Sequence, residues 1–448
     1  MKKVLVANRG EIACRIIRAL QKMSIHAVAV YSTCDKDARH VKLADSSVCI
    51  GPPKALDSYL NISRLIAACE ITGADAVHPG YGFLSENALF AEIVERSGLI
   101  FIGPSSSIIN RLGNKIHAKQ AAKTSNCPII PGSDGEIQSV GEGEKIAKII
   151  GYPVFIKASA GGGGKGIAIA NSEEEFASAY TIAKTEALKF FNDGAVYLEK
   201  KIVNPKHIEV QIIGDNHGNI IHAYERDCTL QRRRQKLVEE TPSVSISAVL
   251  RKKICEAAVS LMKSVEYNSL GTVEFLVDKE AFYFMEVNTR LQVEHTITEE
   301  LTGLDLVAMQ IAIARGERLQ LMQEDIKTFG HVMQFRINAE DPKTFYPNPG
   351  RLTQYQIPID DQVRVDTGFE KGCMISPYYD SLLAKVIVKA DSREDVLKKS
   401  KEILSSFLIK GVASTIPFHL WVLEERMFVN SSHTIGSIDA IIEKGSVI

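Results

Sequence analysis

The sequence predicts a multidomain protein that combines the α/β and α+β fold classes. Its 448 residues, of which 45% are hydrophobic, exceed what one ordinary core organises. Strand and helix signals alternate near the N-terminus, and the strands are continuous apolar runs, which is typical of a parallel sheet covered by helices. Beyond residue 206, longer strand-like runs follow one another across turns, and these indicate antiparallel pairing.

The N-terminal region contains expected strands at 3–8, 26–31, 74–80 and 99–104, and expected helices at 11–23, 62–73 and 86–98. Ile12, Ile16 and Leu20 recur at helical spacing, and Gly73 is placed to cap the second helix. We interpret this region as an open Rossmann-like unit that ends near Ser105. The loop ANRGEIA after the first strand has one glycine where a dinucleotide-binding fingerprint needs three, which disfavours a dehydrogenase.

The remaining elements are expected in two further groups. Helices over 106–130 lead to a hinge-like segment, CPIIPGSDG, and then to a small α+β module over 131–203. After it come expected strands at 206–215, 218–228, 271–278 and 281–288, helices at 295–303 and 305–316, and strands at 331–340, 362–368 and 382–390.

Composition excludes several classes of function. The formal net charge of −1 disfavours a nucleic-acid or anionic-membrane partner. The eight cysteines form neither a CxxC pair nor a zinc-spaced cluster with histidine, as expected of mostly buried free thiols in a reducing cytosol. The apolar run in MKKVLVANRGE stops after four residues, too short for a signal peptide or a membrane span. We therefore expect a soluble, cytoplasmic protein.

The glycine-rich stretch SAGGGGKG, residues 159–166, fits no P-loop, because Lys165 is followed by glycine and the first glycine of that motif is replaced by Ser159. Apolar strands on both sides also argue against a linker. A hairpin loop almost without side chains could lie on a polyphosphate and donate main-chain N–H groups. Lys157 at the end of the entering strand favours this interpretation over a merely mobile surface loop.

A pair of glutamates is predicted to face each other across a hairpin at 271–288. If the turn is centred on Glu280, Asp278 lies opposite Phe282 and Glu274 lies opposite Glu286, with Cβ atoms about 4.5–5.5 Å apart. Two such carboxylates repel unless a cation lies between them or one is protonated. Asn288 shares their face, so the three side chains suit Mg²⁺ or Mn²⁺. The alternative is that both glutamates point to solvent.

Two charged stretches extend this site. Arg290, Gln292 and Glu294 continue on the same side if the chain stays extended, and they could form an oxyanion pocket with a base or a structural ion-pair ladder. The tract CTLQRRRQKLVEE, residues 228–240, is interpreted as an internal phosphate clamp; a nucleic-acid tract or a solvated basic face is the alternative.

Five longer motifs carry a resemblance to a known family. HPGYGFLSEN, KASAGGGGKG, ERDCTLQRRRQK, FYFMEVNTRLQVEH and RINAEDP stand in this order and resemble those of biotin carboxylase, the ATP-grasp component of biotin-dependent carboxylases. The resemblance covers nearly the whole chain. It implies a Rossmann-like pre-ATP-grasp domain at 1–114, an ATP-grasp domain at 115–330 with a mobile lid at 131–203, and a C-terminal biotin carboxylase domain at 331–448.

The resemblance also implies a reaction in two stages. ATP phosphorylates bicarbonate to carboxyphosphate, which releases CO₂, and CO₂ carboxylates N1′ of biotin while free phosphate acts as the base. The implied cofactors are ATP, Mg²⁺ or Mn²⁺ as two ions per site, and biotin presented on a carrier protein. The implied partners are a biotin carboxyl carrier protein, carboxyltransferase subunits and a second copy of the chain, with neither nucleic acid nor a membrane among them.

The family's site residues are carried over by motif. The implied nucleotide-binding positions are Lys115, Lys157, Gly163, Gly164, Glu199, Lys200, Lys201, Ile202, His207, Gln231, Arg234 and Lys236. Of these, Glu199 to Ile202 match the segment that holds adenine in the family. The implied metal ligands are Glu274, Glu286 and Asn288, in agreement with the hairpin argument. The implied bicarbonate site comprises Arg290, Gln292, the Val293 main chain and Lys236, with Glu294 as the base. Arg336 would steady the biotin enolate, and Tyr81 and Phe83 lie in a motif near the biotin pocket.

Two departures from the family pattern and several alternatives stay open. Ala160 replaces the first of five lid glycines, and Arg234 replaces a frequent histidine. No Ala-Met-Lys-Met attachment sequence occurs before Ile448, so biotin is expected on a separate carrier, as in bacterial acetyl-CoA carboxylase. The alternatives are a carboxylase for another acyl-CoA or pyruvate, another ATP-grasp ligase, or a nucleotide-binding regulatory subunit.

Overall fold

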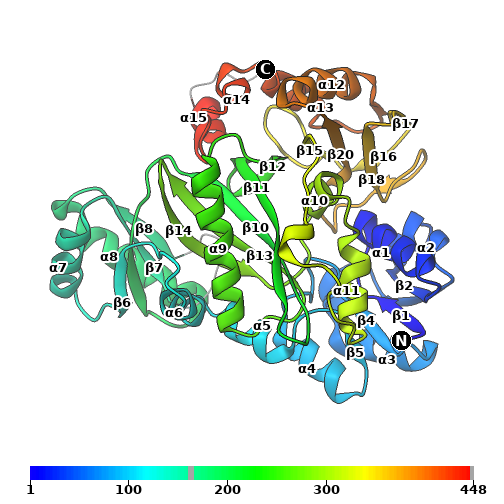
Figure 1. Ribbon diagram of the computed structural model, residues 1–448, viewed down its shortest axis with the longest axis horizontal. Coiled ribbons are helices and arrows are strands. Elements are labelled where there is room, and N and C mark those ends of the chain that lie inside the picture. Colours follow the sequence, from blue (N-terminus) through cyan, green and yellow to red (C-terminus); the bar gives the residue numbers. More distant parts are fainter. Residues whose placement is uncertain (160–165, 444–448) are drawn as a thin grey trace.

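A computed structural model describes residues 1–159 and 166–443, and its described part is organised by three larger sheets (Figure 1). One is parallel, one is a mainly antiparallel sheet of eight strands, and one belongs to a small module at the side. This arrangement confirms the predicted fold class. The predicted loop residues Ala160, Gly163 and Gly164 lie outside the described residues.

The N-terminal sheet has the strand order β3-β2-β1-β4-β5, and all its pairings are parallel. Val4 and Val6 of β1 pack in a core with helices α1 (Gly10–Lys22) and α11 (Leu306–Ala314), whereas Leu5 and the following Ala7 pack in a second core on the opposite face. Gly73 ends α3 in the left-handed conformation, as predicted. The elements are β1 Lys3–Val6, α1 Gly10–Lys22, β2 His26–Ser32, α2 Arg39–Leu43, β3 Ser46–Gly51, α3 Ile62–Thr72, β4 Ala76–His78, α4 Ala88–Arg96 and β5 Ile100–Phe101.

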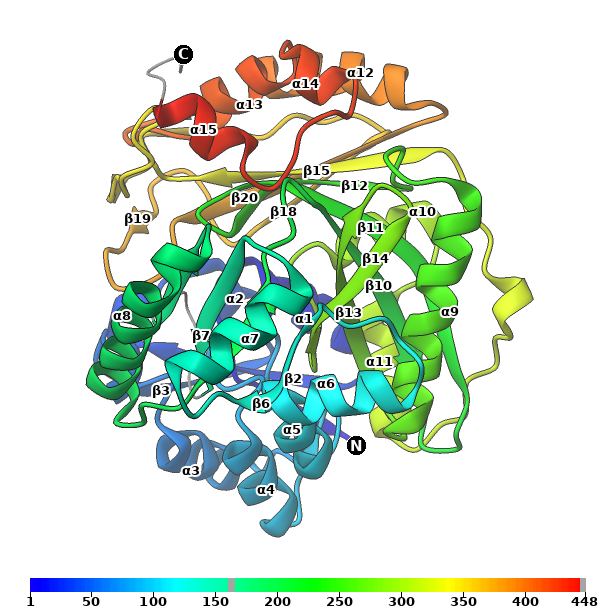
Figure 2. The ribbon, with the colours of Figure 1, turned by 90° about the vertical axis from the view of Figure 1, so that its left-hand side faces the viewer.

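The side module has a four-stranded sheet of order β6-β9-β7-β8 and a hydrophobic core of its own. Helices α5 Ser106–Gly113 and α6 Lys115–Thr124 precede it. Figure 2 shows the module with α7 and α8 beside the larger sheet. Its elements are β6 Gly132–Glu136, α7 Val140–Ile150, β7 Val154–Ala158, β8 Ile167–Ala170, α8 Glu173–Phe191 and β9 Val196–Lys200.

The eight-stranded sheet has the order β14-β13-β10-β11-β12-β15-β20-β18, so it continues across the predicted boundary at residue 331. Its strands are β10 Lys206–Gly214, β11 Ile220–Arg232, β12 Gln235–Thr241, β13 Leu270–Asp278, β14 Ala281–Asn288, β15 His331–Asn338, β18 Val363–Thr367 and β20 Leu382–Ala390. The helices in this half are α9 Ala248–Ser264, α10 His295–Thr302, α11 Leu306–Ala314, α12 Arg393–Ser406, α13 Ile416–Val422, α14 Arg426–Val429 and α15 Ser437–Glu443. Two small ladders pair β16 Gly350–Arg351 with β19 Met374–Ile375, and β17 Gln354–Gln356 with β21 Leu408–Lys410.

The sequence prediction missed several strands, among them β3, β6 and β12. β3 is a polar edge strand, and β12 carries charged residues that are buried because they have partners in the sheet. The eight cysteines are free, and five of them are buried. Within the described ranges, no helix combines the length and apolar character needed to cross a membrane.

Candidate active site

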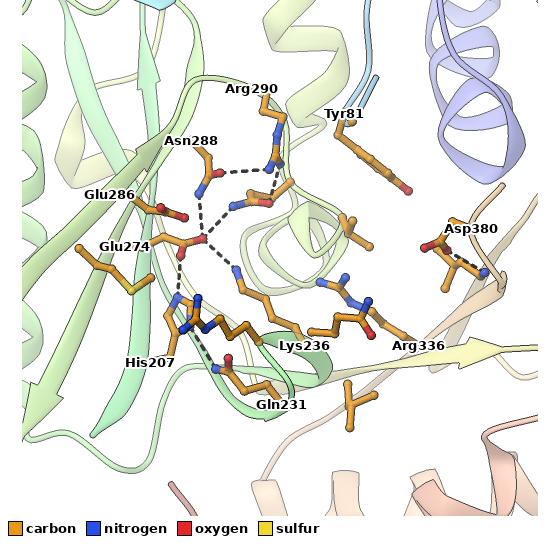
Figure 3. Close-up of a pocket in the computed structure, with 18 of the residues that line it drawn as sticks. Tyr81, His207, Gln231, Lys236, Glu274, Glu286, Asn288, Arg290, Arg336 and Asp380 are labelled. Carbon is orange, nitrogen blue, oxygen red and sulfur yellow. Dashed lines mark hydrogen bonds and ion pairs between the residues drawn. The ribbon is translucent and has the colours of Figure 1, made fainter. Parts of the chain in front are cut away.

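A cavity of about 960 Å³ lies between the N-terminal region, the side module and the large sheet. Figure 3 shows one end of it, where strands of the large sheet present carboxylates, amides and cations toward one another. Loops of the N-terminal region supply Tyr81 and Phe83 to its wall, and the side module supplies Lys157 and Glu199. The cavity is therefore a meeting point of segments that are distant in the sequence.

The predicted pairing of Glu274 with Glu286 is present, but the predicted turn is wrong. Asp278 pairs with Ala281 rather than Phe282, so the turn consists of Lys279 and Glu280. A β-bulge between Glu274 and the next residue shifts the register and restores the opposition of the two glutamates. A simple count outward from the turn cannot detect such a bulge.

Glu274 is the hub of this end of the cavity. Its Oε1 accepts hydrogen bonds from Lys236 Nζ at 2.9 Å, Asn288 Nδ2 at 2.8 Å and Gln292 Nε2 at 3.0 Å. Its Oε2 lies 2.9 Å from His207 Nε2. All five side chains line the cavity, so four of the predicted nucleotide, metal and bicarbonate positions converge on one buried carboxylate.

The pKa values of the two opposing glutamates move in opposite directions. Burial works against ionisation of Glu274, but the charges of Lys236 and His207 outweigh it and hold the pKa of Glu274 below its ordinary value. Burial and the charge of Glu274 together raise the pKa of Glu286. This split is the expected response of two like charges that share a site.

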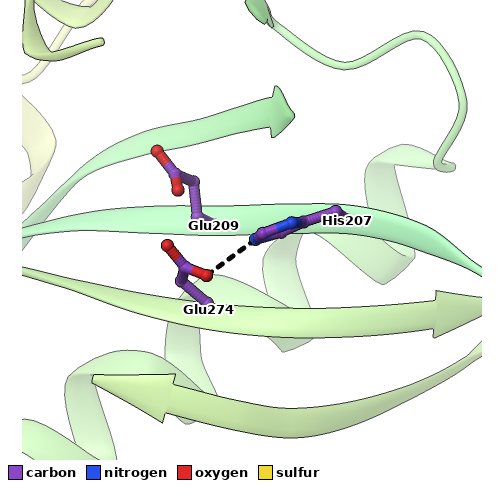
Figure 4. Close-up of side chains that lie close together, drawn as sticks. All are labelled: His207, Glu209 and Glu274. Atoms are coloured by element: carbon purple, nitrogen blue, oxygen red, sulfur yellow. Dashed lines mark ion pairs between the residues drawn. The ribbon is translucent and has the colours of Figure 1, made fainter. Parts of the chain in front are cut away.

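The donor set fits a hard divalent cation. Glu274 and Glu286 supply two carboxylates, and a cation between them would remove their repulsion. Asn288 lies beside them with its Nδ2 on Glu274 and its Oδ1 on Arg290, so its amide would have to turn to offer the oxygen to an ion. A second cluster, His207, Glu209 and Glu274, shares one of these carboxylates, and its ligand atoms lie within 4.8 Å of one another (Figure 4). This second group already contacts internal cations, because Lys236 Nζ lies 2.6 Å from Glu209 Oε2.

The chain does not stay extended over 290–294, so the condition under which Arg290, Gln292 and Glu294 would share one side of a strand is not met. β14 ends at Asn288, and Glu294 stands at the N-terminal end of α10. The tight turn between them still gathers the predicted side chains: Arg290 donates from Nη1 to Gln292 Oε1 at 2.8 Å and from Nη2 to Asn288 Oδ1 at 3.0 Å. Val293 also lines the cavity, and its carbonyl accepts from Lys385 Nζ at 3.0 Å.

Glu294 lies fully buried between two cations. Lys236 Nζ donates to its Oε1 at 2.7 Å, and Arg336 Nη2 donates to its Oε2 at 2.9 Å. Burial opposes its ionisation, but Lys236, Arg336 and Arg226 outweigh that effect and hold the pKa of Glu294 well below its ordinary value. Glu294 is therefore ionised and can accept a hydrogen bond or a proton only from a group held beside these cations.

The predicted nucleotide positions separate into two sets. Lys115 and Lys157 line the cavity, and Glu199 accepts from Lys157 and pairs with Lys119. The other set is the end of the segment expected to hold adenine. Among the described residues that line the cavity, this end is missing: Lys200, Lys201 and Ile202 are not part of the wall. Lys200 Nζ is instead bound to the Gly151 and Tyr152 carbonyls at 2.7 and 3.0 Å, and Lys201 Nζ lies 6.0 Å from the Phe155 ring centre.

The basic tract forms a hairpin rather than a continuous face. Gln231 on β11 and Lys236 on β12 point inward, and Gln231 Nε2 lies 3.3 Å from His207 Nδ1. Arg233 and Arg234 form the exposed turn with positive φ, and Arg234 reaches the cavity wall. This placement excludes a uniform solvated basic face.

At the other end of the cavity, Tyr81 and Phe83 lie beside aromatic and charged neighbours. The Tyr81 hydroxyl donates to Glu11, and the Phe83 ring stacks on Tyr59 with centroids 5.0 Å apart. Arg336 lines the same cavity, and its Nε donates to the fully buried Glu239 at 2.6 Å.

Several neighbours were missed by sequence reasoning: Glu86, Lys119, Glu209, Arg226 and Glu239. For Glu209 a signal existed, since it follows His207 by two positions on one strand and so shares its face. Arg226 bonds Glu209 at 2.5 Å from the neighbouring strand, and only the register of the sheet reveals that contact.

Comparisons with known proteins agree with this arrangement. Residues 1–109 match "Biotin carboxylase, N-terminal domain", residues 114–322 match "Carbamoyl-phosphate synthase L chain, ATP binding domain", and residues 334–440 match "Biotin carboxylase C-terminal domain". Biotin carboxylase 1 of Bacillus subtilis is 48% identical over the full length of both chains.

Two solved structures have the same fold. The biotin carboxylase–β-γ-ATP complex from Campylobacter jejuni has a TM-score of 0.94 and 45% identity, with 98% of each chain covered. The biotin carboxylase domain dimer of Hydrogenobacter thermophilus 2-oxoglutarate carboxylase, in complex with MgADP, ADP and bicarbonate, has a TM-score of 0.92 and 47% identity, covering 98% of this chain and 97% of that one. The chain belongs to the biotin carboxylase family of ATP-dependent ligases.

Proposed function

We propose that this chain carboxylates biotin on a carrier protein, using ATP and bicarbonate, as the first half-reaction of an acetyl-CoA carboxylase. The observation that carries the proposal is the convergence of Lys236, Arg290 and Glu294 beside the Glu274–Glu286 pair. The neighbour that was solved with both MgADP and bicarbonate supports placing the two substrates in this cavity.

The nucleotide is held by cations and a metal. Lys115, Lys157 and His207 line the cavity at positions suited to phosphate oxygens, and Glu199 faces the nucleotide from the side module. Glu274, Glu286 and Asn288 would hold a divalent cation, which would supply positive charge against the negative charge of the phosphates. Two such ions per site, and a role for Gly163 and Gly164 over the phosphates, remain parts of the proposal.

Bicarbonate binds between Arg290, Gln292 and the Val293 main chain, with Lys236 nearby. Glu294 takes its proton; a carboxylate with a lowered pKa is a weak base, so the transfer depends on the surrounding cations stabilising the dianion that forms. The deprotonated oxygen attacks the γ-phosphorus of ATP, and the bond between the γ-phosphorus and the β–γ bridging oxygen breaks. ADP is the leaving group, and carboxyphosphate stays in the site.

The second stage uses the other end of the cavity. Carboxyphosphate divides into CO₂ and phosphate, phosphate accepts the N1′ proton of biotin, and N1′ attacks CO₂. Arg336 lies beside Glu294 and would stabilise the negative charge that develops on the biotin ring. Tyr81 and Phe83 form the adjacent wall.

We also propose the domain limits 1–114, 115–330 and 331–448, with the lid at 131–203; matches to family domains over 1–109, 114–322 and 334–440 support them. A carrier protein and carboxyltransferase subunits complete the complex, and a neighbour described as a domain dimer supports a second copy of the chain as a partner. A cytoplasmic location stays a prediction.

A second candidate differs only in the final acceptor. The similarity to a domain of 2-oxoglutarate carboxylase keeps open a complex that carboxylates a 2-oxo acid rather than an acyl-CoA. Co-purification of the chain with its biotinylated carrier, followed by identification of the carboxyltransferase, separates the two.

The test of the main proposal uses the purified chain with ATP, labelled bicarbonate and free biotin. We expect ADP release to require bicarbonate and to rise with biotin, and the label to appear in carboxybiotin. ATP hydrolysis that is indifferent to bicarbonate would contradict the proposal.

A further inference from the structure

Glu86 reaches from the N-terminal region into the proposed anion site. It lies in the loop that precedes α4, and its two oxygens accept from consecutive residues of another region: Oε1 from the Thr289 main-chain N–H at 3.0 Å, and Oε2 from Arg290 Nε at 2.8 Å. These two residues directly follow β14 and lie 203 and 204 positions further along the chain. One carboxylate thus holds both the start of the 289–294 turn and its arginine.

This contact sets the orientation of the arginine. A guanidinium has five N–H donors. Glu86 accepts a hydrogen bond from Nε of Arg290, while the Leu291 carbonyl and Gln292 Oε1 accept from Nη1 at 3.2 and 2.8 Å. Asn288 Oδ1 takes one Nη2 donor at 3.0 Å. Among the described contacts, this leaves one Nη2 donor of Arg290 for an incoming anion, so a small rotation of the guanidinium changes where that donor points.

The Glu86–Arg290 pair is suited to orientation rather than to stability. Its side chains are 39% and 19% exposed, and ion pairs of such exposure contribute little to folding. The geometry is nevertheless specific, because the same carboxylate also accepts from the neighbouring main-chain N–H. A nonspecific surface pair has no reason to make both contacts.

We propose that Glu86 is a positioning residue for bicarbonate: it holds the Arg290 guanidinium and the start of the 289–294 turn in the geometry that binds the anion. This inference rests on the proposed function of the same site. It gives the N-terminal region a part in bicarbonate binding, because the large sheet by itself leaves the Nε edge of Arg290 without its carboxylate.

The test compares Glu86→Gln with Glu92→Gln. Glu92 is a matched control, since it is 41% exposed and pairs with Arg96 at 2.7 Å on the same helix, away from the cavity. In Glu86→Gln the charge is lost and an amide N–H can face the Thr289 N–H. We expect the KM for bicarbonate to rise about tenfold, as for loss of a partly exposed charge-assisted hydrogen bond, while the KM for ATP changes less than about twofold. Glu86→Asp, which keeps the charge on a shorter stem, is expected to recover part of the loss.

A general structural role predicts a different result. If Glu86→Gln raises both KM values in parallel and lowers Tm, or behaves like Glu92→Gln, the inference is overturned. If Glu86→Gln does not fold, Glu86→Asp carries the same test: a selective rise in the KM for bicarbonate supports positioning, and no rise overturns it. If the unmodified chain itself lacks bicarbonate-dependent ADP release, the proposed function fails, and this inference with it.

Discussion

Replacing Lys236 with methionine tests whether one ammonium group holds the carboxylate cluster together. Lys236 Nζ lies 2.6 Å from Glu209, 2.9 Å from Glu274 and 2.7 Å from Glu294, and its side chain is only 12% exposed. Methionine fills a similar volume without the charge. The three carboxylates are then left close together with fewer cations among them.

The size and pH dependence of the effect follow from this geometry. Removing one partner of a buried ion pair costs about 3–5 kcal/mol, which corresponds to roughly 6–20 °C in Tm for a cooperative unit of about 150–250 residues. Burial alone would raise the pKa values of Glu274 and Glu294, but Lys236 and the neighbouring cations outweigh burial and lower both. In the wild type the ion pairs therefore stabilise the fold at pH values above the ordinary carboxylate pKa, and this stabilisation is lost as pH falls through the lowered pKa values. In Lys236→Met these pKa values rise, so the carboxylates become protonated, and their repulsion is relieved, as pH falls toward 5. The loss of stability relative to the wild type is therefore largest near neutral pH and smaller near pH 5.

The assay is thermal unfolding of both proteins between pH 5 and pH 8, with and without Mn²⁺. Lys252→Met serves as the control, because Lys252 is 77% exposed and pairs with Glu256 at only 3.9 Å. We expect Mn²⁺ to raise the Tm of Lys236→Met more than that of the wild type, since the ion can supply positive charge to the same carboxylates. A Tm difference that is independent of pH and of Mn²⁺ would refute the reasoning.

Three further variants separate the proposed roles. Glu286→Gln is expected to fold with an unchanged or slightly higher Tm, because a like-charge contact is removed, but to lose Mn²⁺ binding by electron paramagnetic resonance and to lose turnover; normal biotin carboxylation would contradict the metal assignment. Glu294→Gln is expected to keep ATP affinity in equilibrium dialysis while bicarbonate-dependent ADP release falls by about 100-fold or more, and release at the wild-type rate would exclude it as the base. Arg336→Gln leaves Glu239 buried without its cation, so we expect a Tm loss together with loss of biotin carboxylation; a variant that carboxylates biotin normally would remove Arg336 from the mechanism.

Much of the fold was predictable because runs and spacings of apolar residues, which are local features of the sequence, predict its strands and helices. The N-terminal strands are continuous apolar runs, and the prediction of a parallel sheet is confirmed. β3 escaped prediction because it is a polar edge strand, and β12 because its buried charged residues have partners that are distant in the sequence. In β12, for example, Glu239 and Glu240 are buried against Arg336 and Arg393.

The candidate site was predicted in part for the right physical reason and in part by resemblance. Glu274 and Glu286 oppose each other as expected, although a bulge rather than the assumed turn produces the register. Arg290 and Gln292 meet through a tight turn and not along a strand. Lys200 was carried over with the adenine segment, yet its ammonium binds carbonyls outside the cavity wall.

The sequence by itself determined the order of the apolar strands and the longer helices, the absence of a dinucleotide fingerprint and the residue types of the site, because periodicity and motif spacing are local properties. Tertiary structure decided which charges meet. Glu86, Lys236, Arg226 and Arg336 reach the site from separate loops and strands, and whether two charged groups stabilise or repel each other depends on a few ångströms that only the packed sheet defines.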